Sequence, residues 1–317
     1  MPASAPSRQV IYAALIGNLL VAATKAGAAM WTGSSAMLSE AVHSFVDTGN
    51  ELLLLYGLRR AARSADLEHP IGYGRELYFW SFIVALLVFA LGAGVSLYEG
   101  VSHILQPQPI SDPFVSYIVF TLALVFEGVS WWFSLRQFRA VKGALGYYEA
   151  FRKSKDPASF VVLFEDSAAL VGILIAALGT YVAVEWNAPV YDGIASILIG
   201  LVLAGTAGLL ARESKSLLIG ERADIALSNS LLRVAHESNP CVRANGVLTV
   251  QLAPDQILAA LSLEFSDELR APQIEEAVIA IEQKIRAAHP EVVTLFVKPQ
   301  TAARFKAIAQ QRYGTQP

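Results

Sequence analysis

AMLSEAVHSFVDTGNELLLLYGL, residues 36–58, is a mainly apolar stretch long enough to cross a lipid bilayer as a helix, since a spanning helix needs about 20 such residues. Three of its ionisable residues, Glu40, His43 and Asp47, follow one another at spacings of three and four, and Asn50 and Glu51 extend the series. Those spacings place the three side chains on one stripe of a helix. Because charge inside a bilayer is costly, we expect the stripe to face the interior of a helix bundle or water.

The composition of the whole chain indicates a membrane protein. Of its 317 residues, 54% are hydrophobic and 16% are charged, and the mean hydropathy is +0.46. These values are too apolar for an ordinary soluble protein. The net charge is −3 and no stretch has the basic character of a nucleic-acid-binding surface, so nucleic acid is not expected as a partner. Cys241 is the single cysteine, which excludes an internal disulfide and a multi-cysteine metal cluster.

Five more stretches have the length and apolar character of a membrane helix. The six transmembrane helices that we expect comprise residues 10–31, 36–58, 79–104, 114–135, 160–184 and 190–210. Lys and Arg gather before the first, between the second and third, and between the fourth and fifth, whereas the alternate connections carry none. By the positive-inside rule, both termini are expected in the cytoplasm, and the membrane is expected to be the inner membrane of a bacterium.

The composition changes after Arg212, where charged and polar residues become frequent. We therefore expect a transmembrane domain over residues 1–212 and a cytoplasmic C-terminal domain over residues 213–317. In the second domain, two stretches have helical spacing and three alternate like strands; in chain order they are residues 223–238, 246–252, 258–265, 274–287 and 292–297. The order α-β-β-α-β, with a turn at Ala253-Pro254-Asp255-Gln256, predicts a ferredoxin-like α+β domain with its helices on one face of the sheet.

The fifth apolar stretch contains a second anionic centre, Glu165 and Asp166. Imidazole and carboxylate ligands suit Zn²⁺ and related cations, and a dication would offset the repulsion and desolvation of the carboxylates. The predicted metal ligands are therefore His43, Asp47, Asp166 and Glu165. Adjacent helical residues point about 100° apart, so Glu165 either binds the metal or faces a polar crevice. The alternative for His43 and Asp47 is a hydrogen-bonded pair that holds helices together.

Other polar residues of the apolar stretches are expected to support the bundle. Glu40 is expected to cap the helix or to act behind the ligands rather than to bind metal. Lys25 and Asn18 share one face of the first stretch, and Glu127 interrupts the fourth; a salt bridge is the preferred interpretation of Lys25, because a lysine repels a metal ion. Close contact between the third and sixth helices is predicted from their glycines, which are Gly92, Gly94, Gly200, Gly205 and Gly208.

Three motifs resemble the cation diffusion facilitator family: SEAVHSFVDTGN (39–50), DLEHPIGYGR (66–75) and YDGIASILIG (191–200). The resemblance covers nearly the whole chain, including the α-β-β-α-β tail. It implies a dimeric transporter that exchanges cytoplasmic Zn²⁺ or a similar ion for protons. The Glu165-Asp166 pair is most similar to the branch that contains a mitochondrial zinc transporter.

The resemblance also implies a transport site with ligands at i and i+4 on the second and fifth helices. These positions hold His43 and Asp47 on one helix and Val162 and Asp166 on the other. Valine cannot bind a metal, so Glu165, Glu40 or a water molecule is left to supply the fourth ligand.

A second site of the family lies in the loop after the second helix and corresponds here to Asp66, His69 and Tyr73. Neutral tyrosine is a poor zinc ligand. We therefore expect this loop site to be absent or weak, and Asp66 and His69 to order the loop.

The chain is thus interpreted as a proton-coupled antiporter that exports a divalent cation by alternating access, and not as an enzyme. The expected substrate is Zn²⁺, with manganese, cobalt, iron and cadmium open, and no organic cofactor is expected. The expected partners are metal ions, protons, the lipid bilayer and a second copy of the chain. The alternatives are a membrane metalloenzyme and a metal-binding sensor or scaffold that does not transport.

Overall fold

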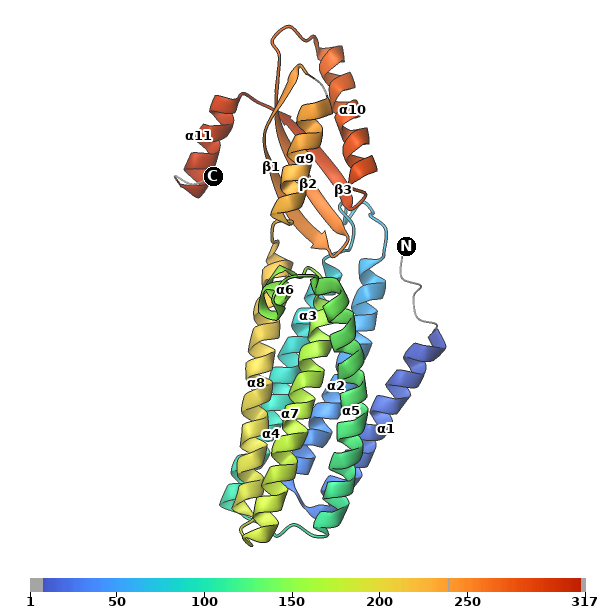
Figure 1. Ribbon diagram of the computed structural model, residues 1–317, viewed down its shortest axis with the longest axis vertical. Coiled ribbons are helices and arrows are strands. Elements are labelled where there is room, and N and C mark those ends of the chain that lie inside the picture. Colours follow the sequence, from blue (N-terminus) through green and yellow to red (C-terminus); the bar gives the residue numbers. More distant parts are fainter. Residues whose placement is uncertain (1–7, 239, 315–317) are drawn as a thin grey trace. The chain divides into compact units, whose positions relative to one another are not determined.

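The computed structural model in Figure 1 describes residues 8–238 and 240–314. The chain divides into two compact units. The helical unit contains the described residues up to Arg60 together with Glu76–Lys215. The C-terminal unit contains Ala61–Arg75 and the described residues from Ser216 onward.

Six long helical segments form the helical unit in the part of the chain that the structure describes. They are α1 (Arg8–Thr32), α2 (Ser35–Ala61), α3 to α4 (Glu76–Leu105), α5 (Pro113–Lys142), α7 (Pro157–Glu185) and α8 (Val190–Ile219), with the short α6 (Tyr147–Lys153) between α5 and α7. Each of the six predicted stretches therefore folds as a helix. Several helices continue past the predicted ends. The apolar run marks only the part of a helix that faces lipid, and the helical hydrogen bonds can extend beyond it.

The third helical segment differs from the uninterrupted helix that is predicted for residues 79–104. A π-helix, η1 (Val88–Ala93), separates α3 (Glu76–Leu87) from α4 (Gly94–Leu105). Such turns are rare insertions into α-helices, and the even apolar character of this stretch gives no signal for one. Gly92 lies in this turn and faces α8, since a Cβ atom added to it would lie 3.3 Å from Leu203 Cδ1.

Four helical stretches of the described chain are long and apolar enough to cross a membrane: Glu76–Leu105, Pro113–Ala140, Phe160–Glu185 and Val190–Ile219. The protein is therefore a helical protein of the membrane type.

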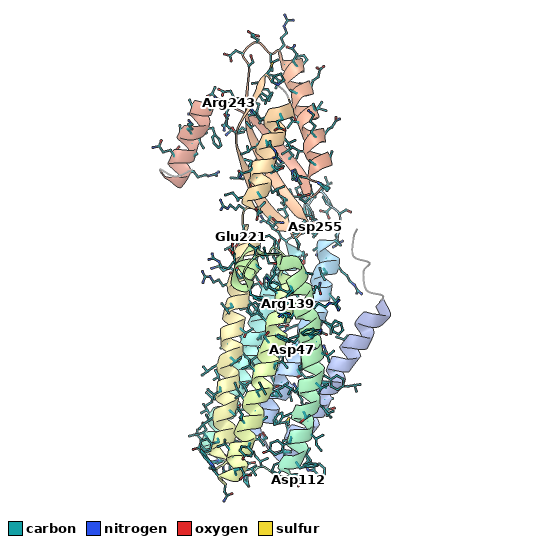
Figure 2. All side chains as sticks on the ribbon, in the orientation of Figure 1. Asp47, Asp112, Arg139, Glu221, Arg243 and Asp255 are labelled. Carbon is teal, nitrogen blue, oxygen red and sulfur yellow. The ribbon has the colours of Figure 1, made fainter. Side chains whose placement is uncertain are left out.

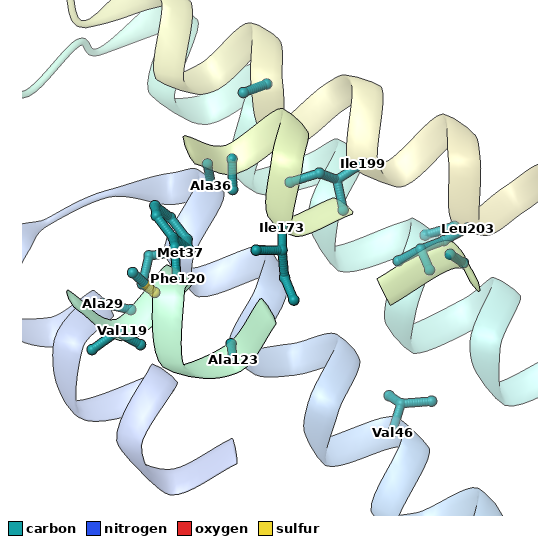
Figure 3. Packing of buried hydrophobic residues seen from close by; sticks show 14 of the residues in the cluster. Ala29, Ala36, Met37, Val46, Val119, Phe120, Ala123, Ile173, Ile199 and Leu203 are labelled. Atoms are coloured by element: carbon teal, nitrogen blue, oxygen red, sulfur yellow. The ribbon is translucent and has the colours of Figure 1, made fainter. Parts of the chain in front are cut away.

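A buried apolar cluster joins the helices of this unit (Figure 3). It includes Met37 of α2, Phe120 of α5, Ile173 of α7, and Ile199 and Leu203 of α8. In addition, α5 packs along α7, and α1 packs against α5. Within lipid, such contacts stabilise a bundle through close van der Waals packing rather than through exclusion of water.

The C-terminal unit contains a three-stranded sheet in the order β1 (Val242–Ala253), β2 (Gln256–Phe265), β3 (Val292–Pro299). β1 and β2 are antiparallel and are joined by the predicted turn after Ala253. β2 and β3 are parallel, because a helix crosses over between them.

Two helices, α9 (Ile225–Ser238) and α10 (Ala271–Ala288), cover one face of this sheet. Leu231 of α9, Ile281 of α10 and Leu261 of β2 belong to a single buried cluster. The predicted order α-β-β-α-β is confirmed, and it is the ferredoxin-like pattern without its first strand. A further helix, α11 (Ala302–Tyr313), follows β3 and is not predicted from the sequence.

The loop Ala61–Arg75 belongs to the C-terminal unit, although it precedes residue 213 and was expected within the transmembrane domain. Its Gly74 approaches the β1–β2 turn so closely that an added Cβ atom would lie 2.7 Å from Gln256 Oε1 and 3.0 Å from the carbonyl oxygen of Leu252. Only a residue without a side chain permits this contact. Composition alone does not reveal it, because the loop is distant in sequence from the sheet.

Candidate metal site

Helix α2 carries the predicted stripe of ionisable residues through the helical unit. Its first turn is held by Asp192 of α8, whose carboxylate accepts hydrogen bonds from the backbone N–H groups of Ser35 (2.6 Å) and Ala36 (3.2 Å). A carboxylate at this position satisfies N–H groups that have no partner within the helix and interacts favourably with the helix dipole. Further along α2, Asp47 lies in the middle of the helical unit (Figure 2).

Asp47, Glu165 and Asp166 line one small pocket between α2, α5 and α7. The cavity has a volume of about 20 Å³, which accommodates about one water-sized species. The other lining residues are Asn18, Ser44, Glu51, Glu127, Ser130 and Val162. The structure thus brings three of the four predicted ligands to one space, and two further carboxylates face it. Such an anionic pocket attracts a cation.

His43 lies one helical turn before Asp47 and does not line this pocket. Its imidazole is 1% exposed, and Nδ1 lies 3.3 Å from Asp47 Oδ1. Neither ring nitrogen, nor Asp47 Oδ1, forms a hydrogen bond with any residue that the structure describes. A buried polar group without a partner costs about 1–3 kcal/mol. His43 and Asp47 therefore lie face to face as a close pair, while neither atom of that pair makes a hydrogen bond with a described residue.

The two carboxylates of α7 have neutral hydrogen-bond donors as partners. Asn50 Nδ2 donates to Glu165 Oε1 at 2.7 Å. Ser130 Oγ and Ser134 Oγ of α5 both donate to Asp166 Oδ2 at 3.0 Å. Glu165 therefore faces the pocket together with Asp166, and it is held there by α2.

Among the described residues, no three His, Cys, Asp or Glu side chains lie close enough together to hold a metal ion. The four-ligand site that the sequence predicts is thus not assembled in this conformation. In this conformation Asn50 is the hydrogen-bond partner of Glu165, and Ser130 and Ser134 are the partners of Asp166.

The position at which the family pattern expects a fourth ligand holds Val162, which lines the pocket and offers no donor atom. Glu40, one of the proposed replacements, is engaged elsewhere. Its Oε2 lies 3.3 Å from Lys25 Nζ, and both side chains are fully buried. Glu165 is therefore better placed than Glu40 to act as the additional ligand.

Lys25 forms the predicted structural salt bridge. Its Nζ lies 3.3 Å from Glu40 Oε2 and 3.7 Å from Glu127 Oε1, and it donates to Ser44 Oγ at 2.8 Å. Ser44 and Glu127 also line the pocket. Lys25 thus joins α1, α2 and α5 beside the pocket without entering it.

The loop residues behave as ordering residues. Asp66 accepts hydrogen bonds from the backbone N–H groups of Glu68 and His69, and Tyr73 Oη donates to Asp66 Oδ2 at 2.6 Å. The hydroxyl of Tyr73 holds the pKa of Asp66 below its usual value, and the same bond raises the pKa of Tyr73. Tyr73 therefore helps to order the loop through Asp66.

Ser130 and Ser134 are partners of Asp166 that were not predicted from the sequence. A signal for them exists, because Glu127, Ser130 and Ser134 follow one another at spacings of three and four. They form a polar stripe on α5, just as the ionisable residues do on α2.

Residues 11–219 match the model of the cation efflux transmembrane domain. The chain belongs to this family, the cation diffusion facilitators. The family that the motifs of residues 39–50, 66–75 and 191–200 indicate is thus confirmed. Cation diffusion facilitators are transporters and not enzymes.

The chain resembles several curated cation diffusion facilitators. It is 35% identical to the mitochondrial proton-coupled zinc antiporter SLC30A9 of Xenopus laevis, over 68% of this chain and 39% of that protein. It is 33% identical to the Homo sapiens protein of the same name, over 74% and 42%. It is also 33% identical to metal tolerance protein C4 of Arabidopsis thaliana, over 69% and 48%. In each case the match spans less than half of the relative's length.

Proposed function

We propose that the chain exchanges a divalent metal ion, Zn²⁺, for protons. The observation that carries this proposal is the set of buried atoms on α2 that have no hydrogen-bond partner among the described residues, namely both ring nitrogens of His43 and Oδ1 of Asp47. They lie beside the pocket that Glu165 and Asp166 line. Inside an apolar bundle, such groups need a partner, and a dication supplies one while offsetting the carboxylate charge. The names of the zinc antiporter relatives support zinc and protons as the exchanged ions.

Metal entry exchanges one set of partners for another in this proposal. Asn50 releases Glu165, and Ser130 and Ser134 release Asp166, so that these carboxylates turn toward an ion that His43 and Asp47 also bind. Imidazole and carboxylate groups must be deprotonated to bind metal. Protons that return to the same groups displace the ion, which couples metal movement in one direction to proton movement in the other.

The proposal includes a membrane arrangement. Six helices, α1, α2, α3 to α4, α5, α7 and α8, cross the bilayer, and both termini share the cytoplasmic side, to which the distribution of Lys and Arg points. The site alternates between the two sides and releases metal away from the cytoplasm. Two copies of the chain act as a homodimer.

Zinc flux into proteoliposomes tests this function. The purified full chain is reconstituted with a zinc indicator inside, and an imposed proton gradient drives uptake. Asp47→Ala and Asp166→Ala are each expected to lower the uptake rate at least tenfold, since loss of even an outer partner of a metal ligand costs about 10–100-fold. Asp112→Ala is the control, because Asp112 lies at the end of the helical unit (Figure 2) and its carboxylate accepts a hydrogen bond from Trp31 Nε1, away from the pocket at Asp47.

Unimpaired uptake by either site variant would refute the site. Zinc binding by the wild-type protein without any flux under a proton gradient would refute transport and favour a sensor or scaffold. Metal-dependent turnover of a soluble product without flux would favour a metalloenzyme.

A further inference from the structure

A second cavity opens at the end of the helical unit where α1 ends, α2 begins and α4 ends. It is about 220 Å³ in volume, roughly ten times the volume of the pocket at Asp47. Its lining contains Ala29, Met30, Gly33, Ser34, Ser35, Leu38, Glu99, Ser102, His103, Gln106 and Gln108. None of these lining residues is a lysine or an arginine, and two carry groups that bind metal.

His103 in this cavity has a buried ring nitrogen without a hydrogen-bond partner. The side chain is 8% exposed, and Nε2 forms no hydrogen bond with any described residue. Ser35 also lines the cavity, is 3% exposed, and has an Oγ without a described partner. Two unpaired and buried polar groups at one cavity cost free energy, and a ligand in the cavity would recover it.

Asp192 lies beside the unpartnered ring nitrogen of His103, with Oδ2 at 3.9 Å from Nε2. Its oxygens already accept hydrogen bonds from Ser34 Oγ, from the N–H groups of Ser35 and Ala36, and from Thr180 Oγ1. This carboxylate caps α2 and already accepts these four hydrogen bonds, so it is not available as a metal ligand. Its negative charge nevertheless lies beside Nε2, the ring nitrogen without a hydrogen-bond partner, where it would attract a cation.

Glu99 precedes His103 by one turn of α4, and both side chains line the cavity. The pair repeats the spacing of His43 and Asp47 on α2, where one helical turn lets a carboxylate and an imidazole converge on one ion. The hydroxyl of Ser35 and the amide oxygens of Gln106 and Gln108 supply further oxygen ligands at the same cavity.

We propose that this cavity is a second site for a divalent cation, held by Glu99 and His103, with the negative charge of Asp192 beside the imidazole. The ligand set selects Zn²⁺ and similar ions that accept imidazole together with oxygen. The site is distinct from the pocket at Asp47, which lies about 18 Å further along α2 than Ser35 at a rise of about 1.5 Å per residue. Its role rests on the proposed function, in which it receives the ion as it leaves the central pocket.

Co²⁺ binding to the full chain tests the second site separately from transport. Asp47→Ala/Asp166→Ala removes the central ligands, and this double variant is expected to bind Co²⁺ still, with the visible absorption of imidazole coordination. Adding His103→Gln or Glu99→Gln is expected to weaken that binding at least tenfold. Ser102→Ala is the matched control, because Ser102 lines the same cavity and is expected to leave Co²⁺ affinity unchanged. If His103→Gln does not fold, Glu99→Gln still tests the same site, because its Co²⁺ affinity can be measured instead.

Absence of Co²⁺ binding by the double variant, or binding that neither added substitution weakens, would overturn the second site even where wild-type zinc flux is intact. Conversely, a wild-type protein without zinc flux whose double variant still binds Co²⁺ through His103 would remove the proposed function and leave the cation site standing.

Discussion

Lys25 and His43 are both buried in the helical unit, yet their surroundings differ. Lys25 has two carboxylates and a hydroxyl within 3.7 Å, so its charge is matched within the protein. His43 has no hydrogen-bond partner among the described residues, and neither does Oδ1 of the neighbouring Asp47. Buried charge of the first kind holds helices together, and polar groups of the second kind are the ones to which the proposed function assigns the metal.

Lys25→Met is expected to lower the free energy of unfolding by about 3–5 kcal/mol, because it leaves the fully buried Glu40 without its cation. Equilibrium unfolding of the purified protein in detergent measures the loss. Lys25→Met/Glu40→Gln is expected to recover most of it, since no uncompensated charge then remains buried. A single variant as stable as the wild type would show that the pair contributes nothing.

The residues of the candidate site could be predicted because the spacing of residues along the sequence determines which side chains share a face of a helix. Positions 43 and 47 must share a face of a helix, and carboxylates in an apolar stretch must find a partner. The partners themselves could not be predicted. That Asn50 bonds Glu165, and that two serines bond Asp166, depends on how α2, α5 and α7 pack, which spacing within one helix does not determine.

At the scale of elements, the glycines at the contact between α4 and α8 show that these two helices approach closely. A Cβ atom added to Gly100 would lie 2.6 Å from Ile197 Cγ1, and one added to Gly193 would lie 2.8 Å from the carbonyl oxygen of Gly100. Of the predicted glycines, Gly92 and Gly200 do face a neighbouring helix, whereas Gly205 has nothing within 4 Å. Small residues in a sequence indicate that helices approach closely, but not which of the residues lie at the contact.

Gly100→Ala is expected to lower the free energy of unfolding by about 1–3 kcal/mol, because the added methyl group would force α4 and α8 apart. Gly205→Ala is the control on α8, and it is expected to be neutral or slightly stabilising, since alanine favours a helix over glycine by about 1 kcal/mol. Thermal unfolding of both variants measures the difference. Equal melting temperatures would contradict the close contact.

The loop Ala61–Arg75 provides a test by pH. Its Asp66 has a lower pKa in the folded chain because of the Tyr73 hydroxyl, compared with about 3.9 in an unfolded chain. The resulting stabilisation is therefore present above the unfolded pKa and is lost as the pH falls through the lowered folded value. Tyr73→Phe is expected to raise the pKa of Asp66 toward 3.9, as measured by carboxyl NMR titration. An unchanged pKa would show that the backbone N–H groups alone hold this carboxylate.

At the scale of the whole molecule, the sequence predicts the elements well and their breaks poorly. Six apolar stretches become six helical segments, and the C-terminal order α-β-β-α-β is found as predicted. The π-helix at Val88–Ala93, the short α6 and the final α11 are missed, because each is short or lacks a clear apolar period. The loop that joins the C-terminal unit is missed because its contact depends on one glycine and not on composition.

The function proposed for the molecule requires one event at its centre, in which a metal ion replaces the hydrogen bonds of Asn50, Ser130 and Ser134. Zinc-edge anomalous scattering from the zinc-loaded full chain observes that event directly. The account predicts a zinc peak with Asp47 and Asp166 oxygens and a His43 nitrogen each at about 2.0–2.2 Å, and with Ser130 and Ser134 no longer bonded to Asp166. Absence of zinc from this pocket, with both serine bonds intact, would contradict it.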